Sequence, residues 1–328
     1  MRVLAILLFV PLQALWLPLS LIGVVLVGYR QLVVSKRLGV SQTAVEILNG
    51  RWTMDVFGLR EDIAARKLAS ALPNNSVLGL WLSLFPLWAV QKLLRVRFLY
   101  PTVPDPIEAR FANLVPSRTV EFDALLEANA PHAEQLVILG AGLDTRAYSD
   151  FKSRGVAIYE VDEAANQAHK RAALDAAGIE SDHVRFVVAD FEQSDWIRSL
   201  LESDYNRDVK TIFLWEGVTL YLPERAVADT LKTLAKHSAP GSVALTDIYA
   251  HRILKLMQSK AIGWSLEITG EATAFGLDFS SNPHGELSAF ASSNGTRLNR
   301  HQFLGAGHKN GAFVVIAEFV LGETPEPD

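Results

Sequence analysis

The chain has 328 residues, a formal net charge of −5 and no cysteine, and 49% of its residues are hydrophobic. The lack of cysteine excludes disulfides, thiolate nucleophiles and Cys-based zinc sites, and the net charge provides no basic field for nucleic acid. The eight histidines do not have the spacing of metal ligands, so no metal site is predicted.

The first long apolar segment runs from Leu4 to Tyr29 and contains no charged side chain. At about 1.5 Å per residue it can cross a bilayer core of roughly 30 Å. We therefore expect residues 1–37 to be a membrane anchor that spans the membrane or lies on it, with a buried core helix as the alternative. Because Arg30, Lys36 and Arg37 follow the segment, the positive-inside rule predicts that the rest of the chain lies in the cytoplasm.

Residues 38–130 are predicted to form a helical extension. Ser41–Leu72 has helical patterning that is interrupted at Gly50 or Gly58, and Arg110–Ala128 is a further predicted helix. Between them, Val77–Val90 is apolar, but its 14 residues are few for a span. We expect this segment to be an interfacial helix or, equally, a lid helix that packs on the main domain.

Residues 131–328 alternate between strand and helix patterns, which predicts an α/β domain with a doubly wound, mostly parallel sheet and right-handed crossovers. Phe313–Leu321 is an apolar run without a following helix, so we expect it to be a late edge strand or an inserted antiparallel strand. The other predicted strands are Leu136–Leu139, Val156–Val161, Val184–Val188, Thr211–Trp215 and Ser242–Ile248, and the predicted helices are Glu163–Ala177 and Glu224–His237.

The first of these strands runs into a tight turn that contains Gly140 and Gly142. Small residues allow the backbone to approach a ligand closely at the carboxyl end of a strand. We expect Asp144 and Thr145 to cap a following helix. The turn lacks the third glycine of a G-x-G-x-x-G pyrophosphate site, which disfavours a dinucleotide.

The next strands end in side chains that suit an adenosine. Asp162 follows Gly142 by 20 residues, where a carboxylate can accept the hydroxyls of a ribose. Asp190 can accept from an exocyclic amine, and Phe191 can pack on an adenine face. The fourth strand ends in Glu216. Each acid alone could be a helix cap, but together they favour a ligand.

S-adenosylmethionine fits these residues better than a dinucleotide does. Its sulfonium is cationic, and a site with Asp144, Asp162, Asp190 and Glu216 would favour positive charge. Its carboxylate needs a cationic partner, and Arg118 or Arg146 could bind it in bidentate geometry. The candidate cofactor-binding residues are therefore Arg118, Gly140, Gly142, Asp144, Arg146, Asp162, Asp190, Phe191 and Glu216.

The motifs GAGLDTRAY, YEVD, a D-F pair and WEGVTLYLPE, preceded by an R-T-x-x-x-D stretch, resemble the leucine carboxyl methyltransferase family. They are closest to its bacterial branch of S-adenosylmethionine-dependent O-methyltransferases. The resemblance covers roughly Ser41 to Val320 and implies a class I methyltransferase (Rossmann-like) fold. It also implies cofactor contacts for the residues above, with Glu216 near the amino group and methyl donor. Tyr221 lies in the same motif, as a candidate catalytic residue or a structural one.

Our functional hypothesis is an O-methyltransferase with an apolar or membrane-resident small-molecule acceptor. A carboxylate acceptor would need no general base, whereas a phenol or alcohol would need one. The candidate bases are His251, His284, His301 and His308. The alternatives are a membrane-tethered binding or scaffold protein without catalysis and, more remotely, a nicotinamide-dependent reductase. The sequence identifies neither the acceptor nor the oligomeric state.

Overall fold

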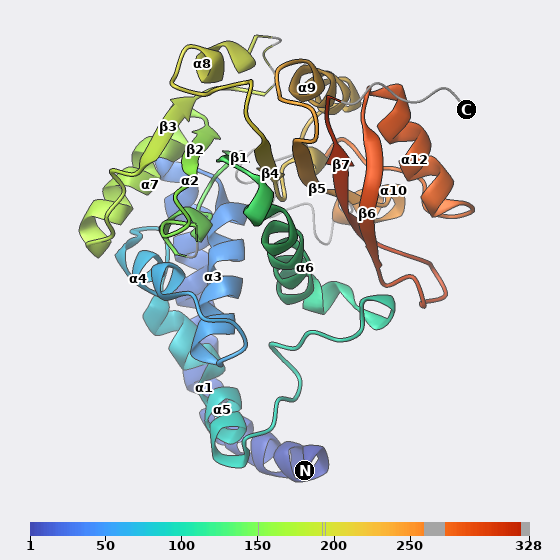
Figure 1. The fold of residues 1–328 in the computed structure, drawn as a ribbon. Coiled ribbons are helices and arrows are strands. Elements are labelled where there is room, and N and C mark those ends of the chain that lie inside the picture. The colour runs from blue at the N-terminus through green and yellow to red at the C-terminus, as the bar shows by residue number, and fades with distance from the viewer. Residues whose placement is uncertain (150, 192, 194, 259–272, 323–328) are drawn as a thin grey trace.

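The centre of the protein is a seven-stranded sheet in the order β3-β2-β1-β4-β5-β7-β6, in which β7 is antiparallel to both of its neighbours (Figure 1). The computed structural model describes residues 1–149, 151–191, 193, 195–258 and 273–322. The strands are β1 Gln135–Leu139, β2 Ala157–Asp162, β3 Val184–Val188, β4 Thr211–Trp215, β5 Val243–Tyr249, β6 Arg297–Leu304 and β7 Val314–Val320. This strand order is that of the class I methyltransferase fold, and it confirms the predicted fold class.

The core of the sheet lies in its central strands. Every residue of β1 and β4 is buried, because parallel strands are covered on both faces. The helices of this part are α7 Ala164–Ala177, α8 Ile197–Leu201, α9 Glu224–Lys236, α10 His251–Met257 and α12 Pro283–Ser293. The apolar run near the end of the chain is an inserted strand, β7, rather than an edge strand.

One predicted helix is wrong. After the glycine turn the chain forms only a short 3-10 turn, Arg146–Tyr148, and Thr145 does not cap it with its side chain. Asp144 accepts a hydrogen bond from the backbone N–H of Arg146 at 2.8 Å, so its carboxylate closes a local turn instead of capping an α-helix. The edge strand β6 was missed because five of its eight side chains are polar and give no apolar run.

The N-terminal part of the chain is helical, as predicted. The structure also shows which of Gly50 and Gly58 interrupts the helical pattern. The helices are α1 Arg2–Gly28, the π-helical turn Tyr29–Val34, α2 Ser35–Leu38, α3 Gln42–Val56, α4 Ile63–Ala71, α5 Val77–Leu94 and α6 Leu114–Asn129. Ser41 caps α3 by accepting from the N–H of Ala44. Gly50 lies inside α3, whereas Gly58 follows its end with φ of +70°, so Gly58 is the interruption.

The two apolar helices α1 and α5 pack antiparallel along each other and reach the end of the molecule that carries the N-terminus (Figure 1). The indole Nε1 of Trp16 donates to the carbonyl of Leu82 at 2.9 Å. By length and composition alone, Arg2–Leu38 and Val77–Leu94 could each cross a membrane, a test that buried helices and signal sequences also pass. The predicted 14-residue apolar segment is thus an 18-residue helix paired with α1.

The helices approach most closely where Gly23 meets Gly79. A Cβ added at Gly23 would lie 2.6 Å from the carbonyl oxygen of Gly79, whereas one added at Gly28 would meet nothing within 4 Å. We expect Gly23→Ala to lower the unfolding free energy by about 1–3 kcal/mol through overpacking. Gly28→Ala, in the same helix, is the matched control. It should leave the unfolding free energy unchanged or raise it by about 0.5–1 kcal/mol. Thermal unfolding of both variants in one detergent checks this, and equal effects would contradict the tight contact.

Candidate functional site

A cavity of about 1370 Å³ lies at the carboxyl ends of β1 to β4. The other wall comes from the helical extension, chiefly the segment from Ser35 to Thr53 and the start of α6. Ligand pockets commonly measure roughly 300–1,000 Å³, so this cavity has room for two small molecules side by side. The predicted site residues that line it are Arg118, Gly140, Gly142, Asp144, Asp162, Asp190, Phe191, Glu216 and Tyr221.

The glycine turn and the end of β2 are joined by a hydrogen bond. Gly140 and Gly142 have φ of +64° and +41°, which only glycine adopts readily. The N–H of Gly142 donates to Oδ2 of Asp162 at 2.6 Å, and Oδ1 of Asp162 accepts from Glu163 N–H at 2.7 Å. Ala44 of α3 lies over the turn, 3.4 Å from where a Cβ on Gly142 would be. The carboxylate of Asp162 is therefore held in one orientation at the cavity wall.

The end of β3 supplies an aromatic wall. The ring of Phe191 packs edge-on against Trp196, with ring centroids 4.9 Å apart, and lies 6.3 Å from the ring of Trp215. Phe191 and Asp190 both line the cavity. The strand end thus offers a fixed ring and an adjacent carboxylate, as predicted from the D-F pair.

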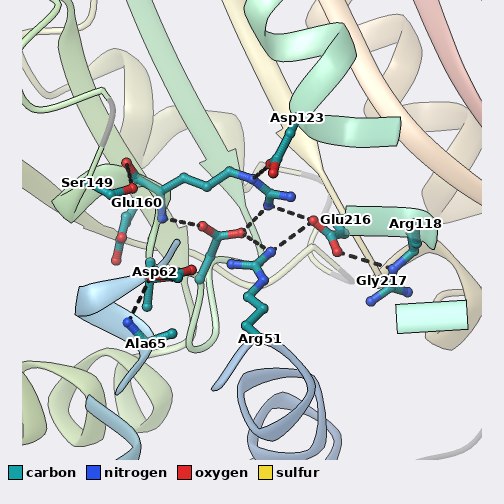
Figure 2. Close-up of polar contacts among 12 residues, drawn as sticks. Arg51, Asp62, Ala65, Arg118, Asp123, Ser149, Glu160, Glu216 and Gly217 are labelled. Carbon is teal, nitrogen blue, oxygen red and sulfur yellow. Dashed lines mark hydrogen bonds and ion pairs between the residues drawn. The ribbon is translucent and has the colours of Figure 1, made fainter. Parts of the chain in front are cut away.

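Glu216, at the end of β4, accepts hydrogen bonds from three arginines of different elements (Figure 2). Its Oε2 accepts from Arg51 of α3 at 3.1 Å and from Arg146 at 2.6 Å, and its Oε1 accepts from Arg118 of α6 at 3.1 Å. Asp144 joins the same network through Arg51 at 2.8 Å and Arg146 at 2.6 Å. All five side chains are almost fully buried.

These contacts keep the two carboxylates ionised. Burial by itself raises the pKa of Glu216, but the charges of Arg146, Arg51 and Arg118 outweigh it and lower the pKa to about 2. Burial opposes ionisation of Asp144 in the same way, and Arg51 and Arg146 hold its pKa well below the usual range. The expectation that Asp144 and Glu216 give the site a negative charge is therefore wrong, because guanidinium groups neutralise both.

Arg118 faces the cavity with much of its guanidinium already bound. Besides Glu216, it donates through Nη1 to Asp247 at 3.0 Å and to the Tyr249 hydroxyl at 2.7 Å. Burial lowers its pKa, but Tyr249, Asp247 and Glu216 more than compensate, so the pKa is raised and Arg118 stays charged. Asp247 and Tyr249 were not predicted as site residues. Asp247 lies in the predicted strand Ser242–Ile248 and Tyr249 directly follows it, so the same inspection of strand ends could have found Asp247.

Arg51 is a third site residue that was not predicted from the sequence, and it differs from Arg146 in its position at the cavity wall. Arg51 lines the cavity, and its Nε and Nη1 are buried without a hydrogen-bond partner among the residues that the structure describes. Among the residues that the structure describes, Arg146 does not line the cavity. Its guanidinium is turned towards Asp123, Asp144 and Glu216 instead. Arg146 is thus a support for the two carboxylates rather than a wall residue.

The candidate general bases are not at the site. Within the described ranges, none of His251, His284, His301 and His308 lines the cavity. His284 and His301 instead pack edge-on against each other with ring centroids 5.0 Å apart. Tyr221 does line the cavity, at the end of the 3-10 turn Thr219–Tyr221. The described residues also contain no group of three or more His, Asp or Glu side chains that could hold a metal ion.

Comparison with known proteins supports the family prediction for the middle of the chain. Residues 96–235 match the model of the family described as "Leucine carboxyl methyltransferase". The match confirms the predicted resemblance over a shorter range than Ser41 to Val320. It covers Arg118, the glycine turn, Asp162 and Glu216.

Several bacterial proteins are similar over part of the chain. One from Mycolicibacterium smegmatis, named "Putative S-adenosyl-L-methionine-dependent methyltransferase", is 34% identical over 161 residues, which are 48% of this chain and 54% of that protein. One of the same description from Streptomyces avermitilis is 35% identical over 148 residues, 43% of this chain and 52% of the relative. The chain thus spans about half the length of the curated relatives that it matches.

Solved structures are similar only at a distance. An O-methyltransferase family protein from Burkholderia thailandensis has 13% identity and a TM-score of 0.43, covering 64% of this chain and 58% of that chain. Magnesium protoporphyrin IX methyltransferase from Synechocystis, with 13% identity and a TM-score of 0.43, covers 65% of this chain and 88% of its own. These scores are too low to assign a function, and the fold assignment rests on the strand order.

The ion network predicts an acid-sensitive contribution to stability. Removing one partner of a buried ion pair costs about 3–5 kcal/mol, so Glu216→Gln should lower the unfolding free energy by about that amount at neutral pH. Because the pKa of Glu216 falls from 4.5 to about 2, its contribution is present above about pH 4.5 and is lost as the pH falls towards 2.

Urea unfolding of wild type and variant between neutral pH and acid checks this window. Glu202→Gln is the matched control, because Glu202 is 62% exposed and pairs with its helical neighbour Arg198. The control should change stability by less than about 1 kcal/mol at every pH. A difference for Glu216→Gln that does not vary with pH would show that the carboxylate charge is not what the network depends on.

Proposed function

We propose that this chain, whose residues 96–235 match the leucine carboxyl methyltransferase family, is an S-adenosylmethionine-dependent O-methyltransferase with a small apolar or lipid-soluble acceptor. The observation that carries the proposal is the placement of Asp162, fixed by the glycine turn, at the wall of a cavity above the strand ends. In open α/β sheets ligands bind at this edge. The names of the bacterial relatives support the same cofactor.

The residues at the cavity fit the chemistry of this cofactor. Asp162 is placed to accept the ribose hydroxyls, and Phe191 offers a ring for the adenine face. The buried Nε and Nη1 of Arg51 are unsatisfied donors at the wall, and an amino-acid carboxylate could accept a charge-assisted hydrogen bond from one of them. Arg118 remains the other candidate for this carboxylate. Glu216 near the amino group also remains a prediction.

When bound, S-adenosylmethionine supplies a methyl group activated by its sulfonium. The chain's own contribution is to bind, orient and exclude water. Arg51 and its ion pairs with Asp144 and Glu216 hold α3 across the strand ends, so the helix covers the cavity. Asp162 and Phe191 fix the adenosine end, leaving the remaining volume for the acceptor.

The cavity favours an acceptor that is already ionised. No histidine lines it in the described ranges, and the phenol that the motif contributes to its wall is Tyr221. A carboxylate is ionised at neutral pH and needs no base, whereas an alcohol does. We therefore place a lipid-soluble carboxylic acid ahead of a phenol as acceptor, with Tyr221 as a positioning hydroxyl.

The scaffold alternative keeps the cofactor site but lacks turnover, so it predicts binding of S-adenosylmethionine without methyl transfer. A nicotinamide-dependent reductase is disfavoured because the turn at Gly140 and Gly142 lacks a third glycine. Binding and transfer assays therefore have to be made separately.

Calorimetric titration of the detergent-solubilised protein with S-adenosylmethionine tests the cofactor, with NADH as the control ligand. We expect Asp162→Asn to weaken binding roughly 10- to 100-fold, because a hydrogen bond to a charged group contributes about 1.5–3 kcal/mol. Asp175→Asn, on the exposed side of α7, is the matched control and should bind as wild type does. Equal affinities of the two variants would contradict the ribose assignment.

Transfer of a labelled methyl group then tests turnover. With lipid-soluble carboxylic acids and with phenols of similar size, we expect methyl esters from the acids and much less product from the phenols. Binding of S-adenosylmethionine without transfer to either class would support the scaffold alternative. Failure of the folded protein to bind S-adenosylmethionine would overturn the proposal.

A further inference from the structure

The outer surface of α1 is apolar along its whole length. A stripe that includes Ala5, Phe9, Trp16, Ser20 and Gly23 faces α5, and its two polar members find partners there. Most other side chains of the helix are exposed, with Leu15 exposed by 83% and Val25 by 68%. Soluble proteins rarely expose a continuous apolar surface of this kind, so it needs an apolar partner.

The charged side chains in these two helices and the segments that flank them are all positive. Residues 1–40 and 73–104 contain no Asp or Glu but seven of the 31 Lys and Arg. The other 24 Lys and Arg stand against 36 Asp and Glu, which gives the remaining chain a net charge of −12. An anionic surface would thus attract the α1–α5 pair and repel the rest of the protein. A bilayer that contains anionic lipid provides both this charge and the apolar interior.

The packing of the pair argues against a crossing of the bilayer. The ring of Phe98 lies 5.8 Å from that of Phe9, so the irregular segment after α5 runs beside the first third of α1. In this segment Arg97 donates to the carbonyl of Gly58, at the end of α3.

If α1 crossed the membrane, these neighbours would have to enter the hydrocarbon. The exposed Arg95 and Arg97, and the loop at Gly58, would lie at membrane depth. Irregular backbone exposed to lipid does not occur in the hydrocarbon core, and charged side chains there are costly. The surface of α1 that is turned away from α5 can enter the membrane while Arg95, Arg97 and the loop at Gly58 stay outside the hydrocarbon.

We infer that α1 lies in the plane of one leaflet of an anionic bilayer, with its outer apolar face inserted and α5 between it and the catalytic part. An in-plane helix is inserted by roughly 5–10 Å, comparable with the helix diameter of about 10–12 Å. Arg2, Lys92 and Arg95 near one end and Arg30 and Lys36 near the other meet the lipid headgroups. The cytoplasmic leaflet carries such a negative surface, in agreement with the predicted location.

This orientation also places the cavity close to the lipid. Ser35 and Lys36, directly after the turn that follows α1, line the cavity, and so does Tyr100, shortly after α5. The acceptor therefore reaches the cavity from the bilayer interface. This last step rests on the proposed function, whereas the orientation of α1 does not.

Depth measurements along one face of α1 test the orientation. Because the chain has no cysteine, single-cysteine variants of the full chain carry one label each. Leu7→Cys, Ala14→Cys and Val25→Cys fall within about 20° of one another on the face opposite α5. Each is labelled with an environment-sensitive fluorophore, reconstituted in phosphatidylcholine vesicles with about a quarter phosphatidylglycerol, and quenched by lipids that carry nitroxides at known depths.

An in-plane helix gives the three labels the same shallow depth, within about 5 Å. A spanning helix instead places the label at position 14 deeper than both others by roughly 10 Å, at 1.5 Å per residue, and this result would overturn the inference. A steady gradient from position 7 to position 25 would also overturn it, since it indicates that only one end is inserted. Lys232→Cys, on the exposed side of α9, is the control that lipid nitroxides should not quench.

Sidedness provides a second readout that does not depend on depth. A membrane-impermeant maleimide should label Arg2→Cys and Lys232→Cys from the same side of sealed vesicles. Labelling from opposite sides would mean that α1 crosses the bilayer. Neither measurement involves methyl transfer, so failure of the orientation and failure of the proposed function are distinguishable.

Discussion

The carboxylate of Glu216 joins the two parts of this protein. It lies at the end of β4, and its two oxygens accept from Arg51 of the helical extension, Arg118 of α6 and Arg146 after the glycine turn. Three guanidinium groups this close would repel one another in a buried site if the carboxylate were absent. The wall that α3 contributes to the cavity therefore depends on a charge that the sheet supplies.

The same network decides the electrostatics of the cavity. The acidic residues at the strand ends are of two kinds, because Asp144 and Glu216 are paired with arginines, whereas Asp162 is held by backbone N–H groups and an amide. Paired acids position the helices, and Asp162 remains an acceptor at the wall. A count of carboxylates in the sequence overestimates the negative charge that a ligand would meet, since it does not include the buried guanidinium groups.

Much of the sheet could be predicted because its strands are continuous apolar runs. The parallel strands and the antiparallel β7 agree with the patterns, and Asp162, Asp190 and Phe191 lie where the strand ends place them. The polar edge strand β6 could not be found in this way, because an exposed edge needs no apolar run.

The contacts of Arg51 could not be predicted for a different reason. Its partners Asp144 and Glu216 are 93 and 165 residues away in the chain, and periodicity carries no information on such pairs. An arginine in a helix is usually a solvated side chain, and only the fold shows that this one is buried. The candidate bases His251, His284, His301 and His308 show the opposite error. They were expected within reach of the site because they lie in the C-terminal third, but in the described part of the chain none of them lines the cavity.

Helix α3 connects the ion network with the apolar pair. Arg51 lies in the network, and its neighbour Trp52 packs edge-on against Trp81 of α5 at 5.5 Å between ring centroids. Further along, the indole of Trp88 donates to the carbonyl of Val56 at the end of α3. Because protein interiors are close-packed, α5 cannot shift along α3 without displacing these rings. The face that α1 and α5 present to their surroundings is thus held in a fixed relation to the cavity by one helix, which carries a buried charge and an aromatic contact at adjacent positions.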